Sequence, residues 1–162
     1  MNRLQRIEEI KRFIKENFET HILFASEVFL GKKESNFVNN ESIENFLRNK
    51  DDTFSVKLLR YIDKKDMEDL ACYKAAGVSK QTWYKIMNEK TYMPSKKTVL
   101  AFGIVLKLTY EEMSDLLKSA GFSLSKSSKF DLIIEYCIKR GIYDLYEINQ
   151  ILADFREGTL GI

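Results

Sequence analysis

The amino-acid sequence predicts an all-α protein, and its composition and helix-capping residues support this prediction. The chain has one proline and seven glycines in 162 residues, too few for the many turns of an all-β fold. Apolar residues make up 44% of the chain and charged residues 31%. We therefore expect a real hydrophobic core, in one domain or in a small domain with additions at both ends.

The first third of the chain gives mixed signals. Apolar residues recur at helical spacing and predict an amphipathic helix over residues 5–18. Residues 22–30 are apolar without a clear period, so they form either a short helix or an extended segment. Residues 31–40 have the composition of a loop, and Asn40 is expected to cap a short helix after it.

From Thr53 onward, capping residues delimit seven helices. Thr109 with Glu112, and Asp144 with Glu147, have the spacing of capping boxes, and glycines follow three of the helices. The expected helices are residues 54–65, 68–76, 80–88, 96–107, 110–120, 128–138 and 145–155, and the last few residues are expected to fray.

Positive charge is concentrated in the middle of the chain. The net charge is only +2, but residues 54–125 carry twelve lysines and arginines against eight acids, while each flank has one acid in excess. Residues 69–99 alone hold six lysines and two acids. A local basic surface on a nearly neutral protein favours a binding face over a general polycation.

Patterns of catalysis and metal binding are absent from the sequence. His21 is the only histidine, and Cys72 and Cys137 lie far apart, which favours reduced, partly buried thiols over a disulfide or a metal site. No glycine-rich phosphate loop, signal peptide or membrane-spanning stretch is found. We expect a cytoplasmic protein that is not an enzyme, binds no cofactor or metal and does not enter the membrane.

The most informative motif is a pair of helices joined by Gly-Val-Ser at residues 77–79. The glycine suits a helix end with positive φ, the valine can enter the core, and the serine can cap the next helix. Together with residues 94–100 and 106–113, which match two later helix junctions, this motif makes residues 54–122 resemble the lambda-repressor-like (XRE-type) helix-turn-helix domains.

The resemblance implies a domain organisation. Residues 53–122 would form the five-helix DNA-binding domain, after an N-terminal helical extension of unknown role at residues 1–52. The two extra helices within residues 123–162 either complete the core or form a dimer interface. The tail also resembles a segment of bacterial helix-turn-helix proteins found beside or fused to ADP-ribose-processing macrodomains, which implies a bacterial or phage protein linked to such systems.

The resemblance also implies a DNA-binding site. In that family the third helix of the module, here residues 80–88, enters the major groove, while Trp83 and Ile86 would face the core. Base contacts are expected from Lys80, Gln81, Tyr84 and Lys85, with Gln81 suited to adenine and Lys80 or Lys85 to guanine. Backbone contacts are expected from Ser79, Thr82, Asn88, Lys90, Lys96 and Lys97.

Some residues depart from the family pattern. Asp69, beside Glu68, stands where the family commonly has a glutamine that touches phosphate, and Tyr73 replaces a small residue between the two helices. Glu89 stands where glycine is common, so Asn88 is expected to supply a left-handed residue instead.

Two functions are therefore weighed. The first is a sequence-specific, double-stranded DNA-binding regulator of transcription that acts as a homodimer. The second is a protein-binding helix-turn-helix adaptor, antitoxin-like or phage-type inhibitor, whose partner contacts the extension at residues 1–52. The acids at the start of the second helix and the near-neutral total charge favour the second function.

Overall fold

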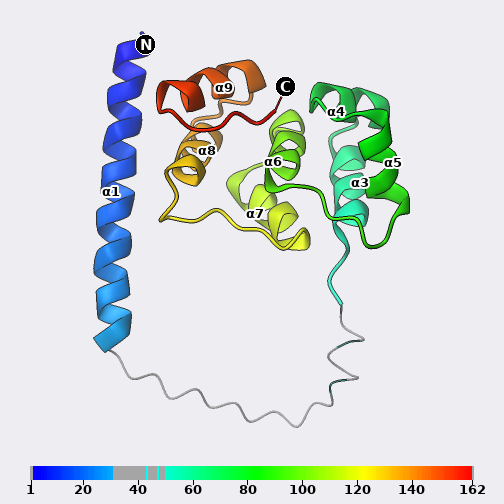
Figure 1. Ribbon diagram of the computed structural model, residues 1–162, viewed down its shortest axis with the longest axis horizontal. Helices are drawn as coiled ribbons and strands as arrows, with labels where there is room; N and C mark the ends of the chain where they lie inside the picture. Colours follow the sequence, from blue (N-terminus) through cyan, green and yellow to red (C-terminus); the bar gives the residue numbers. More distant parts are fainter. Residues whose placement is uncertain (1, 31–42, 44–46, 48–49, 162) are drawn as a thin grey trace.

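The computed structural model describes residues 2–30, 43, 47 and 50–161, with side chains for the same residues outside 21–30. This part of the chain is helical and contains no β-strand, which confirms the all-α prediction for the described residues. The helices labelled in Figure 1 are α1 Arg3–Leu30, α3 Phe54–Lys64, α4 Asp69–Ala75, α5 Lys80–Asn88, α6 Lys96–Val105, α7 Tyr110–Ser119, α8 Lys129–Lys139 and α9 Leu145–Asp154.

The first helix is longer than the sequence predicts. α1 runs unbroken from Arg3 to Leu30, so residues 22–30, for which the sequence allowed a helix or an extended segment, are helical. The loop expected at residues 31–40 lies outside the described residues, as does nearly all of the short helix expected after Asn40.

One of the two expected capping boxes is complete. In α7, the Thr109 hydroxyl accepts the Glu112 amide at 3.2 Å and the Glu112 carboxylate accepts the Thr109 amide at 3.0 Å. In α9, the Asp144 carboxylate accepts the Glu147 amide at 2.8 Å, but the Glu147 carboxylate is bound to Arg6 of α1. The second box is therefore half formed, because the Glu147 carboxylate pairs with Arg6 instead of accepting the Asp144 amide.

Six helices, α3, α4 and α6 to α9, end with the same Schellman motif, in which a residue of positive φ follows the helix and the next amide reaches a carbonyl five residues back. Glycine fills the positive-φ position three times, at Gly77, Gly121 and Gly141. Residues with side chains fill it after the other three helices: Asp66 after α3, Lys107 after α6 and Arg156 after α9.

The hydrophobic core runs continuously from Ile10 in α1 to Leu160 near the C-terminus. α8 is its most enclosed helix, because every residue from Asp131 to Ile138 is buried, and it packs against α1, α7 and α9. The two C-terminal helices therefore complete the core, which is one of the two roles that the sequence left open.

The tail after α9 is fixed, contrary to the expectation that it frays. Leu160 is buried, and its backbone amide donates to the Asn149 side chain at 2.8 Å. The tail therefore contributes to the body of the protein.

The N-terminal half of α1 is also part of the body. Ile10 is fully buried, and the Phe13 ring meets the Tyr136 ring edge-on with centroids 5.5 Å apart. Three ion pairs tie α1 to the C-terminal helices: Arg3 with Asp154, Arg6 with Glu147, and Glu9 with Arg140.

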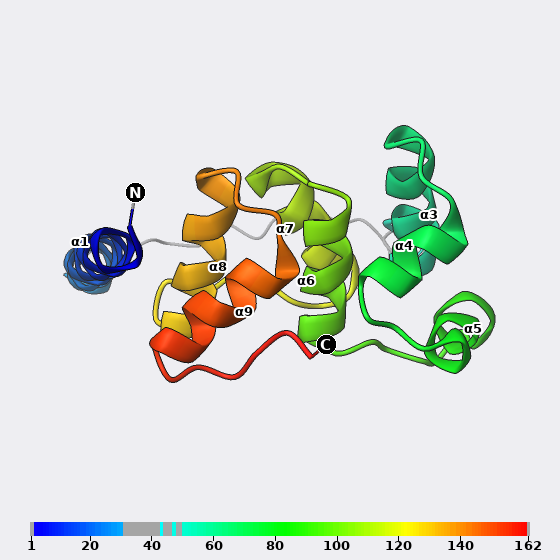
Figure 2. The same ribbon diagram turned by 90° about the horizontal axis from the view of Figure 1, so that it is seen from above.

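The helices form a row. Seen from above in Figure 2, α1 stands at one end, α3, α4 and α5 at the other, and α6 to α9 fill the space between them. α5 and α1 are therefore at opposite ends of the described structure.

Candidate nucleic-acid interface

The turn between α4 and α5 has the geometry that the Gly-Val-Ser motif predicts. Gly77 has a φ of +67°, and the Val78 amide donates to the Tyr73 carbonyl at 2.9 Å. The Ser79 hydroxyl then accepts the Thr82 amide at 3.1 Å and caps α5. α5 spans Lys80–Asn88, the range that the sequence predicts.

The inward side of α5 is held by aromatic packing. Trp83 stacks on Tyr73 with ring centroids 5.3 Å apart and lies against Phe102 of α6 at 5.9 Å. Ile86 is buried in the same core. The prediction that Trp83 and Ile86 face inward is therefore confirmed. The Trp83 indole stacks on Tyr73, which is one of the residues that depart from the family pattern.

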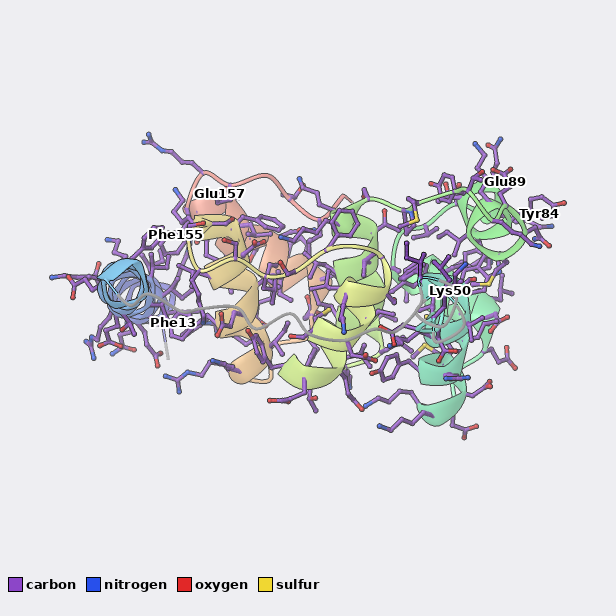
Figure 3. All side chains as sticks on the ribbon, turned by 90° about the horizontal axis from the view of Figure 1, so that it is seen from below. Phe13, Lys50, Tyr84, Glu89, Phe155 and Glu157 are labelled. Carbon is purple, nitrogen blue, oxygen red and sulfur yellow. The ribbon has the colours of Figure 1, made fainter. Side chains whose placement is uncertain are left out.

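The outward side of α5 carries most of the residues expected to contact bases. Lys80, Gln81 and Tyr84 are exposed, and 62% of the Tyr84 surface is open to solvent. Figure 3 shows Tyr84 at the far end of the molecule. Lys85 differs, because it is half-buried and its ammonium lies 5.9 Å from the centroid of the Tyr92 ring.

The residues expected to contact the DNA backbone fall into two groups. Ser79, Asn88, Lys90 and Lys97 are exposed, while Thr82 is half-buried and its hydroxyl accepts a hydrogen bond from Ser79 at 2.9 Å. Lys96 forms an ion pair within the protein, because its ammonium lies 2.7 Å from the buried carboxylate of Asp131.

The expectation for Asn88 is wrong. Among the described residues other than glycine, positive φ occurs only at Asp66, Lys107 and Arg156. The chain instead leaves α5 in an extended conformation, with a φ of −100° at Glu89, so no left-handed residue is needed. The Asn88 amide group donates to the Tyr84 carbonyl at 3.0 Å.

Four of the lysines on and around α5 have no carboxylate partner in the described part of the chain. Among the described residues, none of Lys80, Lys85, Lys90 and Lys97 lies within ion-pair distance of a carboxylate. Glu89, which directly follows α5, is an exposed acid, and so are Glu68 and Asp69 at the start of α4. The helix pair therefore exposes acids as well as lysines.

The described residues offer little for metal binding or thiol chemistry. No group of three or more histidine, cysteine or carboxylate side chains comes together among them. Cys72 and Cys137 are free and buried, and burial raises the pKa of each thiol to about 12. Both thiols are therefore fully buried, where the sequence predicted partly buried ones, and they form no disulfide with each other.

Comparisons with known proteins add no family to this picture. No family model, no curated protein and no solved structure matches the chain.

Among the helices that the structure describes, none is both long and apolar enough to cross a membrane.

Proposed function

We propose that this protein is a sequence-specific, double-stranded DNA-binding regulator of transcription, with α5 as the recognition helix of a helix-turn-helix module. The two-sided character of α5 carries this proposal. Trp83 and Ile86 fix its inner side, while Lys80, Gln81 and Tyr84 stand exposed on its outer side. An anchored helix with free polar side chains suits the width of the major groove.

The exposed side chains suggest separate roles. Gln81 can donate to and accept from the edge of adenine, and Lys80 can donate to the two acceptors of guanine. Lys85 lies closer to the body and would need to leave the Tyr92 ring to reach a base. Lys90 and Lys97 suit phosphate contacts, because both are exposed and neither pairs with a carboxylate that the structure describes.

A homodimer would complete the site. One recognition helix covers a half-site, and a second copy related by a two-fold axis would present its own helix about one DNA turn, roughly 10 base pairs, away. The proposal therefore includes an operator with two related halves.

Salt-dependent binding to random-sequence duplex DNA tests the proposal. The wild-type protein is expected to bind at ~50 mM salt and to lose affinity steeply as salt rises, because bound phosphates release counterions. The double variant Lys80→Glu/Lys85→Glu is expected to abolish binding with little change in the melting temperature, because neither lysine pairs with a carboxylate among the described residues.

The matched control is Arg12→Glu/Lys107→Glu, which changes the net charge equally. Arg12 lies on α1 and Lys107 follows α6; both are exposed and distant from α5 in the chain. This control should retain binding. Absence of duplex binding by the wild-type protein, or full binding by Lys80→Glu/Lys85→Glu, would reject DNA recognition through α5 and favour the protein-binding hypothesis.

Selection of bound sites from a random duplex pool extends the test to specificity. An enriched, palindromic sequence is the result expected of a dimeric regulator, and a pool that stays random would reject sequence specificity.

A further inference from the structure

We infer that residues 155–160, here called the tail segment, form with the start of α6 a second phosphate-binding surface beside the recognition helix. The occupant is the sugar–phosphate backbone of the same duplex, since this surface offers cations rather than base-reading groups. This inference rests on the DNA-binding function proposed above.

The tail segment is held in a defined place. The Lys129 ammonium of α8 donates to the Phe155 carbonyl at 3.0 Å and pairs with the Glu157 carboxylate at 3.0 Å. At the other end of the segment, buried Leu160 is bound through its amide to Asn149. A segment fixed at both ends can present a side chain at a constant position.

The tail segment lies against Lys97. A Cβ atom added at Gly158 would come within 2.8 Å of the Lys97 ammonium, so the tail backbone passes directly beside that cation. The same ammonium lies 5.8 Å from the centroid of the Phe130 ring in α8. Lys97 is therefore placed where α6, α8 and the tail segment meet, and it is exposed there.

The tail segment itself contributes a second cation, Arg156. It is exposed, and among the described residues no carboxylate lies within ion-pair distance of it. The adjacent acid, Glu157, is already bound by Lys129. Arg156 and Lys97 therefore remain available for an anion from outside the protein.

This surface and α5 lie along one side of the molecule. In Figure 2 the tail runs along α9 and ends beside the start of α6, where the connection from α5 arrives from the other direction. Figure 3 shows Glu157 of the tail and Glu89 at the end of α5 along the same edge. A duplex held by α5 could continue along this edge, because the start of α6 links the two regions.

The structure supplies a closely matched pair of variants. Arg156 and Lys107 both occupy the positive-φ position of a Schellman motif, with φ values of +59° and +50°. Replacing either with glycine removes one positive charge at a position where glycine suits the backbone. Lys107 follows the C-terminal end of α6, the end opposite Lys97, so Lys107→Gly is the control for Arg156→Gly.

Binding of wild type, Arg156→Gly and Lys107→Gly is measured against salt on random-sequence duplexes of ~10 and ~24 base pairs, about one and two helical turns. On the longer duplex, Arg156→Gly should bind several-fold more weakly, and its log–log salt slope should be shallower by about 0.9, as for one lost phosphate contact. Lys107→Gly should match wild type. The double variant Lys97→Ala/Arg156→Gly should reduce the steepness of the salt slope about twice as much as Arg156→Gly does.

The outcomes separate this inference from the proposed function. On the shorter duplex, which α5 can occupy without the tail segment, wild type and Arg156→Gly should differ less. If wild type binds and Arg156→Gly equals Lys107→Gly on the longer duplex, the second surface is rejected and DNA binding through α5 stands. If wild type binds neither duplex, both are rejected.

Discussion

The two regions at α8 and α5 use charged residues in opposite ways. In α8, the carboxylates of Asp131 and Glu135 are almost fully buried, and each is bound by lysine ammonium groups. On α5, Lys80 is exposed and makes no ion pair among the described residues. The lysines around α8 therefore stabilise the fold, whereas Lys80 is available to bind a partner.

Burial explains this difference. A buried carboxylate without a partner is costly, so the cation that binds it cannot be removed freely. An exposed lysine is already solvated and adds little to stability. Truncation to alanine should therefore distinguish lysines that stabilise the fold from lysines that are available to a partner.

The largest effect is expected for Lys96→Ala. It removes the lysine that pairs with the Asp131 carboxylate, which is 3% exposed and would keep only the Ser125 amide as a donor among the described residues. Removing one partner of a buried pair costs about 3–5 kcal/mol. Lys80→Ala should change the free energy of unfolding by less than about 0.5 kcal/mol. Urea denaturation of both variants measures this difference, and equal effects would contradict the comparison.

Lys126→Ala is a control for the same region. Glu135 is bound by both Lys126 and Lys139, each at 2.6 Å, so one cation remains after the substitution. We expect a smaller loss of stability than for Lys96→Ala.

A smaller effect is expected for Trp83→Ala, which removes the anchor of α5. Trp83 is only half-buried, so the loss should fall near the lower end of the range for large aromatic truncations, about 3 kcal/mol. Tyr84→Ala, on the exposed side of the same helix, should stay within about 0.5 kcal/mol of wild type. Thermal and urea denaturation check both values, and similar losses would mean that α5 has no distinct inner side.

The smallest effect is expected at the seam of α3 and α7, between the two regions. The Glu112 carboxylate is bound by Lys64 and the Thr109 amide, which lower the pKa of Glu112 below its usual 4.5. Its charge therefore stabilises the protein above pH 4.5, and this contribution is lost as the pH falls through the lowered pKa.

Glu112→Gln keeps the capping spacing and removes the charge. At pH 7 it should cost no more than about 1 kcal/mol, since the pair with Lys64 is partly exposed. The difference from wild type should shrink steadily as denaturation is repeated at lower pH. A loss that is independent of pH would assign the effect to packing instead.

Local sequence signals predicted much of the fold. The bounds of α5 were predicted correctly because Gly77 and Ser79 mark the turn and the cap before it. The ends of α3, α4, α7 and α9 were placed one residue too far, whether or not a glycine follows the helix, and the end of α6 two residues too far, where Lys107 follows instead of a glycine.

Tertiary contacts account for what the sequence could not reveal. Lys96 was expected to contact DNA, and nothing in its neighbourhood along the chain indicates that a carboxylate 35 residues later binds it. Arg156 was not singled out, since a lone arginine near a chain end gives no signal until the tail is seen beside Lys97. The extent of α1 was open because its second half lacks a clear period.

The buried carboxylate of Asp131 also limits how this protein can be dissected. A shortened chain that stopped after α7 would keep Lys96 but lose the Asp131 carboxylate that binds it. It would also expose the side of α6 that α9 covers. The freed ammonium would then lie at the start of α6, close to the side proposed to bind DNA. If the protein binds DNA as proposed, such a fragment would show an affinity different from that of the intact chain, even with α5 unchanged.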